Sequence, residues 1–150
     1  MHRPRGAARG SLHSPPMFEI QVEAEFAAAH ALAIAGVREP VHGHNWHIVV
    51  TLAGETLDAD GLLCDFHTVE ESLREIVLRY HNRNLNDTPP FDRVNPSAEL
   101  VARHIAEALE ARLGTALAPA AWIESVSTTE APGCRATYRP RRGVSGGRAS

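Results

Sequence analysis

Three histidines in the first third of the chain have the spacing of metal ligands. His42 and His44 are separated by one glycine, and His30 stands upstream in the segment FAAAH. In an extended segment, residues two apart point to the same side, so both imidazoles of the pair can reach one ion. Three histidine ligands with an open fourth position are typical of a catalytic zinc site, and an all-histidine set suits zinc best among common ions. Another divalent transition metal, or solvated histidines without a metal, are the alternatives.

Two acidic residues are candidates for the same chemistry. Glu39 precedes His42 by three residues, and a carboxylate beside a bound metal can act as a general base. Glu130 ends a β-rich segment just before an Ala-Pro-Gly turn, where a carboxylate can accept two hydrogen bonds from a planar, amidine-like edge of a ligand. Alternatively, Glu39 is a fourth metal ligand or a surface residue, and Glu130 is an exposed residue at a strand end.

Other histidines show no ligand pattern. His47 is out of phase with the histidine pair, so we expect it to face away from the metal site. Four more have no partner pattern and are expected on the surface, namely His2, His13, His67 and His104.

Strands must flank these residues. Segments that alternate between apolar and polar residues, or are rich in β-branched residues, predict strands over residues 17–26, 45–53, 121–129 and 134–139. Glycine and proline make residues 27–43 irregular in this prediction, and the polar, proline-containing segment 81–96 is predicted to be a long loop.

Two helices are predicted between the second and third strands. The first begins at a capping box formed by Thr68 and Glu71. The second begins at Asn95, followed by proline, and ends at Gly114. The order β-β-α-α-β-β indicates an α+β domain, in which a four-stranded antiparallel sheet carries both helices on one face. Such a sheet has two open edges, so we expect oligomerisation through them.

Length and composition limit the class of protein. The chain has 150 residues, 43% hydrophobic and 22% charged, which indicates one globular domain and excludes a fibrous or disordered chain. Seven of the 15 basic residues lie at the two ends and all 18 acidic residues lie between them, which argues against a nucleic-acid partner. No apolar run is long enough to span a membrane. Two cysteines are too few for a disulfide scaffold, so a cytoplasmic location is expected. We expect residues 1–16 and 140–150 to be disordered tails on a domain of residues 17–139.

Six ordered segments carry a family resemblance: FAAAH at 26–30, HGHNW at 42–46, Gly61 with DF at 65–66, NLND at 84–87, NPSAE at 95–99, and Glu130 with Tyr138. Together they resemble the 6-pyruvoyl-tetrahydropterin synthase / 6-carboxy-tetrahydropterin synthase family, over about residues 18–139. The resemblance implies a tunnelling fold (T-fold), in which subunits pair their sheet edges into barrels, as trimers that stack into hexamers.

The resemblance also implies a ligand set. In this reading zinc is held by His30, His42 and His44 and binds the side-chain hydroxyls of 7,8-dihydroneopterin triphosphate, a substrate that lies between subunits. Glu130 matches the glutamate that anchors the amino-pyrimidine edge of the pterin.

The sequence departs from the family pattern at two places. The usual cysteine four residues before the first histidine of the pair is Arg38 here, whereas Glu39 gives the pattern E-x-x-H-G-H. That pattern resembles a third subgroup, in which a glutamate replaces the cysteine and the pterin side chain is cleaved to a 6-hydroxymethyl group. The family's Asp-His pair corresponds to His81-Asn82, or, with a slip of one residue, to Tyr80-His81. In both cases the orienting carboxylate is missing, and His81 is a candidate acid or base. Arg38 and Arg83 flank the predicted site and are candidates to offset the triphosphate charge.

These residues favour a zinc-dependent lyase that forms a 6-hydroxymethyl pterin. One alternative is a 6-carboxy-tetrahydropterin synthase of the deazaguanine (queuosine) pathway, or a 6-pyruvoyl-tetrahydropterin synthase. An alternative of another class is a non-catalytic relative that binds a pterin or a metal.

Overall fold

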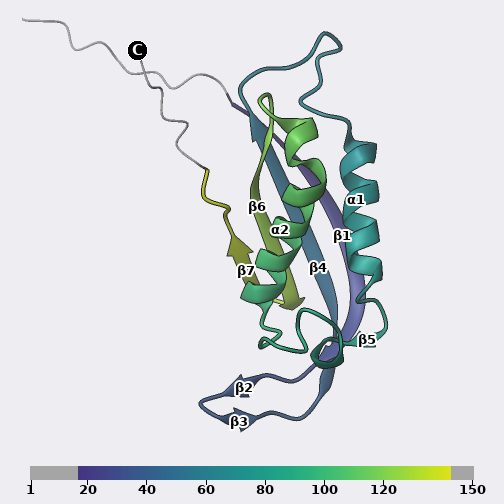
Figure 1. The fold of residues 1–150 in the computed structure, drawn as a ribbon, viewed down its shortest axis with the longest axis vertical. Helices are drawn as coiled ribbons and strands as arrows, with labels where there is room; N and C mark the ends of the chain where they lie inside the picture. The colour runs from purple at the N-terminus through teal and green to yellow at the C-terminus, as the bar shows by residue number, and fades with distance from the viewer. Residues whose placement is uncertain (1–16, 143–150) are drawn as a thin grey trace, which may run out of the picture.

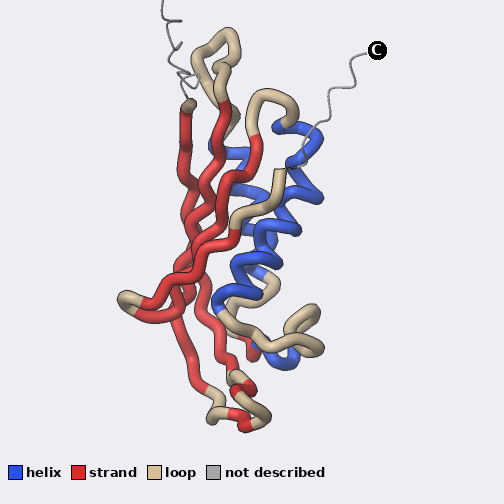
Figure 2. The backbone as a smooth tube through the Cα atoms, turned by 90° about the vertical axis from the view of Figure 1, so that its left-hand side faces the viewer, coloured by secondary structure: helices blue, strands red, loops and turns tan. Residues whose placement is uncertain are grey.

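A computed structural model describes residues 17–142, so the two predicted tails lie outside the described residues except for 140–142. Five strands form one sheet in the order β5-β1-β4-β6-β7. The two helices cover one face of this sheet and leave the other face open (Figures 1 and 2). The sheet strands are β1 (Phe18–His30), β4 (His42–Gly54), β5 (Arg83–Asn84), β6 (Trp122–Ala131) and β7 (Cys134–Tyr138). The remaining elements are the hairpin strands β2 (Ala33–Ile34) and β3 (Val37–Arg38), a 3-10 turn (Leu85–Asp87), α1 (Phe66–Leu78) and α2 (Ala98–Leu117).

The pairing of β1 with β4 positions the histidines. The two strands are antiparallel along their whole length, from Phe18 opposite Gly54 to His30 opposite His42. Every second residue of each strand therefore faces the helices, and these include all three predicted ligands. The β2–β3 hairpin returns the chain from the end of β1 to the start of β4 (Figure 1).

The helix-covered face forms the hydrophobic core. On β1 and β4 its central pair is Phe26 and Trp46, whose rings stack with centroids 5.9 Å apart. Each helix buries apolar residues at helical spacing on the side that faces the sheet, Val69, Leu73, Ile76 and Val77 on α1 and Val101, Ala102, Ile105 and Leu109 on α2. No described helix is both long and apolar enough to cross a bilayer.

The architecture confirms the predicted α+β fold and its four antiparallel strands, with two additions. The short β5 pairs in parallel with β1, and it lies in the segment predicted to be a loop. Residues 27–43 are less irregular than predicted, because β1 continues to His30 and the β2–β3 hairpin follows. The backbone of residues 82–84 forms hydrogen bonds with the end of β1, and these bonds stabilise residues 27–29 as part of the strand.

Both helix starts differ from the prediction. The N-cap of α1 is Asp65, whose carboxylate accepts a hydrogen bond from the His67 amide at 2.9 Å, rather than Thr68. The N-cap of α2 is Ser97, because the side chain of Asn95 is used elsewhere in the fold. Gly114 does not end α2, since a single glycine costs only about 1 kcal/mol and the buried Leu117 continues the apolar stripe.

His104 is not the surface residue that the sequence suggested. Its Nε2 lies 2.7 Å from the Tyr80 hydroxyl, and the Phe91 ring packs against it with centroids 5.3 Å apart. Burial lowers the pKa of His104, and the charge of Arg79 lowers it further, against a raising effect of Glu107. The neutral imidazole thus shares a hydrogen bond with the Tyr80 hydroxyl.

A pH dependence of stability follows from His104. Its pKa in the folded chain is below the ordinary value of 6.5, so the unfolded chain binds more protons below that pH. We expect the free energy of unfolding to fall as the pH drops from about 7.5 to about 5.5, and to fall less steeply in His104→Gln. Denaturant melts across this range would show it. The exposed His67→Gln should keep the wild-type slope, and an equally steep slope in His104→Gln would contradict the prediction.

Candidate metal centre

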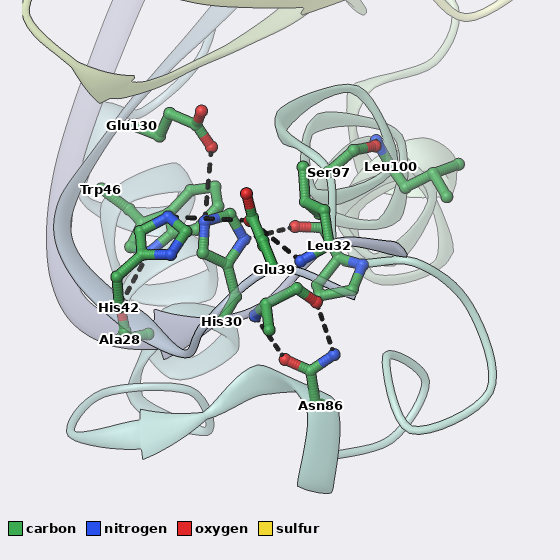
Figure 3. A network of polar contacts seen from close by, with 12 residues as sticks. Ala28, His30, Leu32, Glu39, His42, Trp46, Asn86, Ser97, Leu100 and Glu130 are labelled. Atoms are coloured by element: carbon green, nitrogen blue, oxygen red, sulfur yellow. Dashed lines mark hydrogen bonds and ion pairs between the residues drawn. The ribbon is translucent and has the colours of Figure 1, made fainter. Parts of the chain in front are cut away.

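The three predicted metal ligands meet where β1 ends and β4 begins. The ring centroids lie 4.8 Å apart for His30 and His42, 5.1 Å for His30 and His44, and 4.7 Å for His42 and His44. One ligand atom from each residue lies within 4.8 Å of the other two (Figure 3). His30 is buried and His42 exposed, so the cluster opens toward solvent on one side.

The hydrogen bonds of the rings prepare the Nε2 atoms for a metal. His30 Nδ1 donates to the Pro96 carbonyl at 2.8 Å, and His42 Nδ1 donates to the Pro40 carbonyl at 2.9 Å. Because a carbonyl only accepts, each Nδ1 carries a hydrogen, and in the neutral ring the Nε2 lone pair is then free for a metal. The Nε2 atoms of His30 and His44 are buried and have no hydrogen-bond partner within residues 17–142. Metal-bound histidines in proteins are held in this way by outer carbonyl groups, so these residues fit zinc.

The surroundings keep the third ligand neutral. Burial lowers the pKa of His44, and the nearby His30 and His42 lower it further, while Glu130 and Glu39 act in the opposite direction. Below the cluster, the fully buried Trp46 packs edge-on against His30 with centroids 4.9 Å apart. Its indole N–H donates to the Ala28 carbonyl at 3.1 Å, which fixes the ring.

The structure brings Glu39 to this cluster. Its Oε1 lies 3.8 Å from His42 Nε2 and accepts a hydrogen bond from the Leu32 amide at 2.9 Å. About a third of the side chain is exposed, so the carboxylate can be reached by a ligand. Figure 3 shows it between Leu32 and the histidines.

Glu130 reaches the cluster from the opposite side. Its Oε2 lies 3.8 Å from His30 Nε2 and has no hydrogen-bond partner within residues 17–142 (Figure 3). Glu130 also lines a hollow of about 530 Å³ that it shares with His44. A buried carboxylate oxygen without a partner is costly, so a ligand with N–H donors would stabilise it there.

The remaining candidates lie further out. Arg83 lines a hollow of about 580 Å³ with His44, whereas Arg38 lines a separate hollow of about 190 Å³ with Arg93. His81 is exposed beside β1, where its Nδ1 accepts a hydrogen bond from the Ala27 amide at 3.2 Å. The out-of-phase His47 faces the open side of the sheet, with its ring nitrogens 3.2 Å from the carboxylates of two β1 glutamates, as predicted.

Sequence reasoning missed the groups that hold these side chains. They are the carbonyls of Pro40 and Pro96 and the amide of Leu32, and any residue type could supply them. A histidine–carbonyl contact across 66 positions has no local signal in the sequence.

Comparisons with known proteins identify the family of this chain. The family model described as 6-pyruvoyl tetrahydropterin synthase matches residues 19–141. The 6-carboxy-5,6,7,8-tetrahydropterin synthase of Bacillus subtilis is 31% identical over 135 residues, which cover 86% of this chain and 90% of that protein.

Solved structures share the fold. The Caenorhabditis elegans 6-pyruvoyl tetrahydropterin synthase superposes with a TM-score of 0.72 at 21% identity, covering 87% of this chain and all of that one. A Plasmodium vivax 6-pyruvoyltetrahydropterin synthase, solved as a catalytic-residue mutant with glutamate replaced by alanine, gives 0.70 at 21% identity over 85% of this chain and 99% of that one. The chain belongs to the 6-pyruvoyl tetrahydropterin synthase family.

Proposed function

We propose that this protein is a zinc-dependent, pterin-forming lyase that cleaves the side chain of 7,8-dihydroneopterin triphosphate to leave a 6-hydroxymethyl pterin. The observation that carries the proposal is the Glu39 carboxylate, 3.8 Å from His42 in a three-histidine cluster. The replaced catalytic residue of the Plasmodium vivax protein is also a glutamate, which supports the same role for Glu39.

Each residue has a role in the proposed reaction. Zinc bound to His30, His42 and His44 would polarise the hydroxyl oxygens of the substrate side chain. Glu39 accepts the proton of a hydroxyl on the second side-chain carbon, that oxygen becomes a carbonyl, and the bond to the first side-chain carbon breaks. The second carbon leaves as an aldehyde that carries the triphosphate. The electron pair moves into the imine of the dihydropterin ring. His81 is the proposed group that returns a proton to the first side-chain carbon, so no oxidant or reductant is needed.

A second product is favoured by a different observation. The Bacillus subtilis relative is named a 6-carboxy-tetrahydropterin synthase and is 31% identical, so the same site could form a 6-carboxy product. A 6-pyruvoyl product is the corresponding alternative from the family name.

Identifying the product by mass distinguishes these reactions. The zinc-loaded protein is incubated with 7,8-dihydroneopterin triphosphate, and we expect a 6-hydroxymethyl pterin. A 6-carboxy or 6-pyruvoyl product would replace the first proposal with the second. Unchanged substrate that still binds would indicate a non-catalytic relative and contradict both.

We propose that Glu130 anchors the amino-pyrimidine edge of the pterin. Two charge-assisted hydrogen bonds would form there, and losing the charge costs about 1.5–3 kcal/mol. Glu130→Gln should therefore raise KM about 10- to 100-fold, measured by steady-state kinetics. Glu124→Gln, on the same strand but bonded to Trp122 and Arg139, is the matched control. A KM like that of wild type would count against the anchor.

Arg38 and Arg83 are proposed to bind the triphosphate. A substrate that extends from Glu130 past His44 would place its phosphates toward the hollow lined by Arg83. The double replacement Arg38→Ala with Arg83→Ala should raise KM far more than it lowers kcat, and Arg83→Ala alone should account for most of the rise. Binding of dihydroneopterin without phosphates should be unchanged. An unaltered KM for the triphosphate would refute this role.

We also propose a homo-oligomer, a trimer or hexamer with sites between subunits. β5 covers only Ala28 and Ala29 on the outer edge of β1, and β7 forms the other edge of the described sheet. The β1 strand carries Glu19, Glu23 and Glu25, whereas β7 carries Arg135 and is followed directly by Arg139, so the two edge strands have opposite charge, which favours pairing one with the other. Analytical ultracentrifugation should give a mass three or six times that of the chain, and a monomer would contradict it.

The two free cysteines fit a cytoplasmic location.

A further inference from the structure

The side chains of two asparagines are hydrogen-bonded to the backbone segment that follows β1. Asn86 Oδ1 accepts a hydrogen bond from the Ala31 amide at 2.8 Å, and its Nδ2 donates to the Ala31 carbonyl at 2.9 Å. Asn95 binds Ala33 in the same way, at 2.9 Å from the amide and 3.0 Å to the carbonyl. Each carboxamide thus pairs with one residue as a neighbouring strand would.

Leu32 lies between Ala31 and Ala33, and its backbone is hydrogen-bonded to Glu39 on the opposite side of the segment. The Leu32 amide donates to Glu39 Oε1 at 2.9 Å, and the Glu39 amide donates to the Leu32 carbonyl at 2.9 Å. In an extended segment, successive peptide groups point to opposite sides. The asparagines hold one side of residues 31–33, and this directs the Leu32 amide at the Glu39 carboxylate. Figure 3 shows the Asn86 and Glu39 contacts.

The loop that carries the asparagines also holds a metal ligand. The residue after Asn95 is Pro96, whose carbonyl accepts the hydrogen bond of His30 Nδ1 at 2.8 Å. By contrast, the side chain of Asn84, at the end of β5, is hydrogen-bonded within its own turn, to the Asn86 amide and the Asp87 carboxylate. Asn95 is exposed and adds little to the core. Its two hydrogen bonds to Ala33 therefore fix the position of the backbone segment rather than bury apolar surface.

We propose that Asn86 and Asn95 are positioning residues for Glu39, holding residues 31–33 so that the Leu32 amide fixes the carboxylate beside His42. The inference rests on the proposed function, in which Glu39 is the base. If either asparagine side chain is removed, residues 31–33 can shift and the hydrogen bond from the Leu32 amide to Glu39 Oε1 lengthens. The carboxylate then rotates away from the substrate hydroxyl. Misplacement of a catalytic group by about 1 Å can cost 10²-fold in rate.

Kinetics of the zinc-loaded protein test the inference first. Asn95→Ala should lower kcat about 10- to 100-fold, with KM and zinc content close to those of wild type. In the Glu39→Gln background the same replacement should change kcat less than about 2-fold, because both substitutions remove one function. Asp87→Ala, which removes a hydrogen bond to Asn84 and leaves the bonds of both asparagines to Ala31 and Ala33 in place, is the control and should keep wild-type kinetics. Equal losses in both backgrounds, or a loss in KM alone, would overturn the inference.

Exchange of the Leu32 amide hydrogen provides a readout without turnover. Measured by NMR, this hydrogen should exchange faster in Asn86→Ala, Asn95→Ala and Glu39→Ala than in wild type. In Asp87→Ala its exchange rate should equal that of wild type. A Leu32 amide that stays protected in Asn95→Ala would overturn the proposal whatever the kinetics. If Glu39→Gln keeps full activity, the proposed function fails, while the exchange data still decide whether the asparagines position the carboxylate.

Discussion

Replacement of Glu39 with glutamine is expected to lower kcat by about 10²- to 10⁴-fold, the range supplied by general acid–base catalysis. The amide keeps the shape of the side chain and can still accept the Leu32 hydrogen bond, but it cannot take a proton from the substrate. The three histidines are untouched, so zinc content should be that of the wild-type protein. Steady-state turnover of 7,8-dihydroneopterin triphosphate measures the effect.

A glutamate remote from the site serves as the control. Glu110→Gln, on the exposed face of α2, should leave kcat and zinc content unchanged. If Glu39→Gln turned over substrate as fast as Glu110→Gln, another group would be the base. If it lost zinc instead, Glu39 would be a fourth ligand, the alternative that the sequence left open.

Removal of a single histidine from the cluster should abolish metal binding and activity together. His42→Ala is the informative variant, because about two-fifths of that side chain is exposed and the fold should tolerate its loss. Losing an outer hydrogen-bond partner of a metal ligand already costs about 10- to 100-fold in affinity, so losing the ligand itself should cost more than about 100-fold. Competition with a chromogenic chelator measures zinc affinity.

His47→Ala is the matched control on the same strand. It removes an imidazole from the open side of the sheet, where it contacts Glu23 and Glu25, and should keep wild-type zinc affinity. Equal zinc affinities in the two variants would exclude His42 as a ligand.

The sequence was most informative where strand periodicity and chemistry coincide. Alternation in β1 and β4 predicts which face each side chain takes, and this is enough to separate His44 from His47. The apolar stripes of both helices follow from their period, so the two-layer α+β fold was predictable. The continuous pairing of β1 with β4 then brings His30 opposite His42.

Contacts between distant segments could not be predicted in this way. Asn95 has the residue type of a helix cap and precedes a proline, yet its side chain pairs with Ala33, 62 positions away, and Ser97 caps the helix. His104 shows the same limit, because its half-buried position depends on where Tyr80 and Phe91 lie in the folded chain. A local pattern predicts an element, whereas the partner of a polar side chain depends on the tertiary structure.

The proposed reaction requires a metal at the three-histidine cluster, and metal reconstitution tests this requirement most directly. The protein is stripped of metal, assayed with 7,8-dihydroneopterin triphosphate, and assayed again after zinc is returned at one ion per subunit. We predict no turnover in the stripped protein and recovery with the added zinc, with a 6-hydroxymethyl pterin as the product. Full turnover without metal, or none after zinc has bound, would contradict the account.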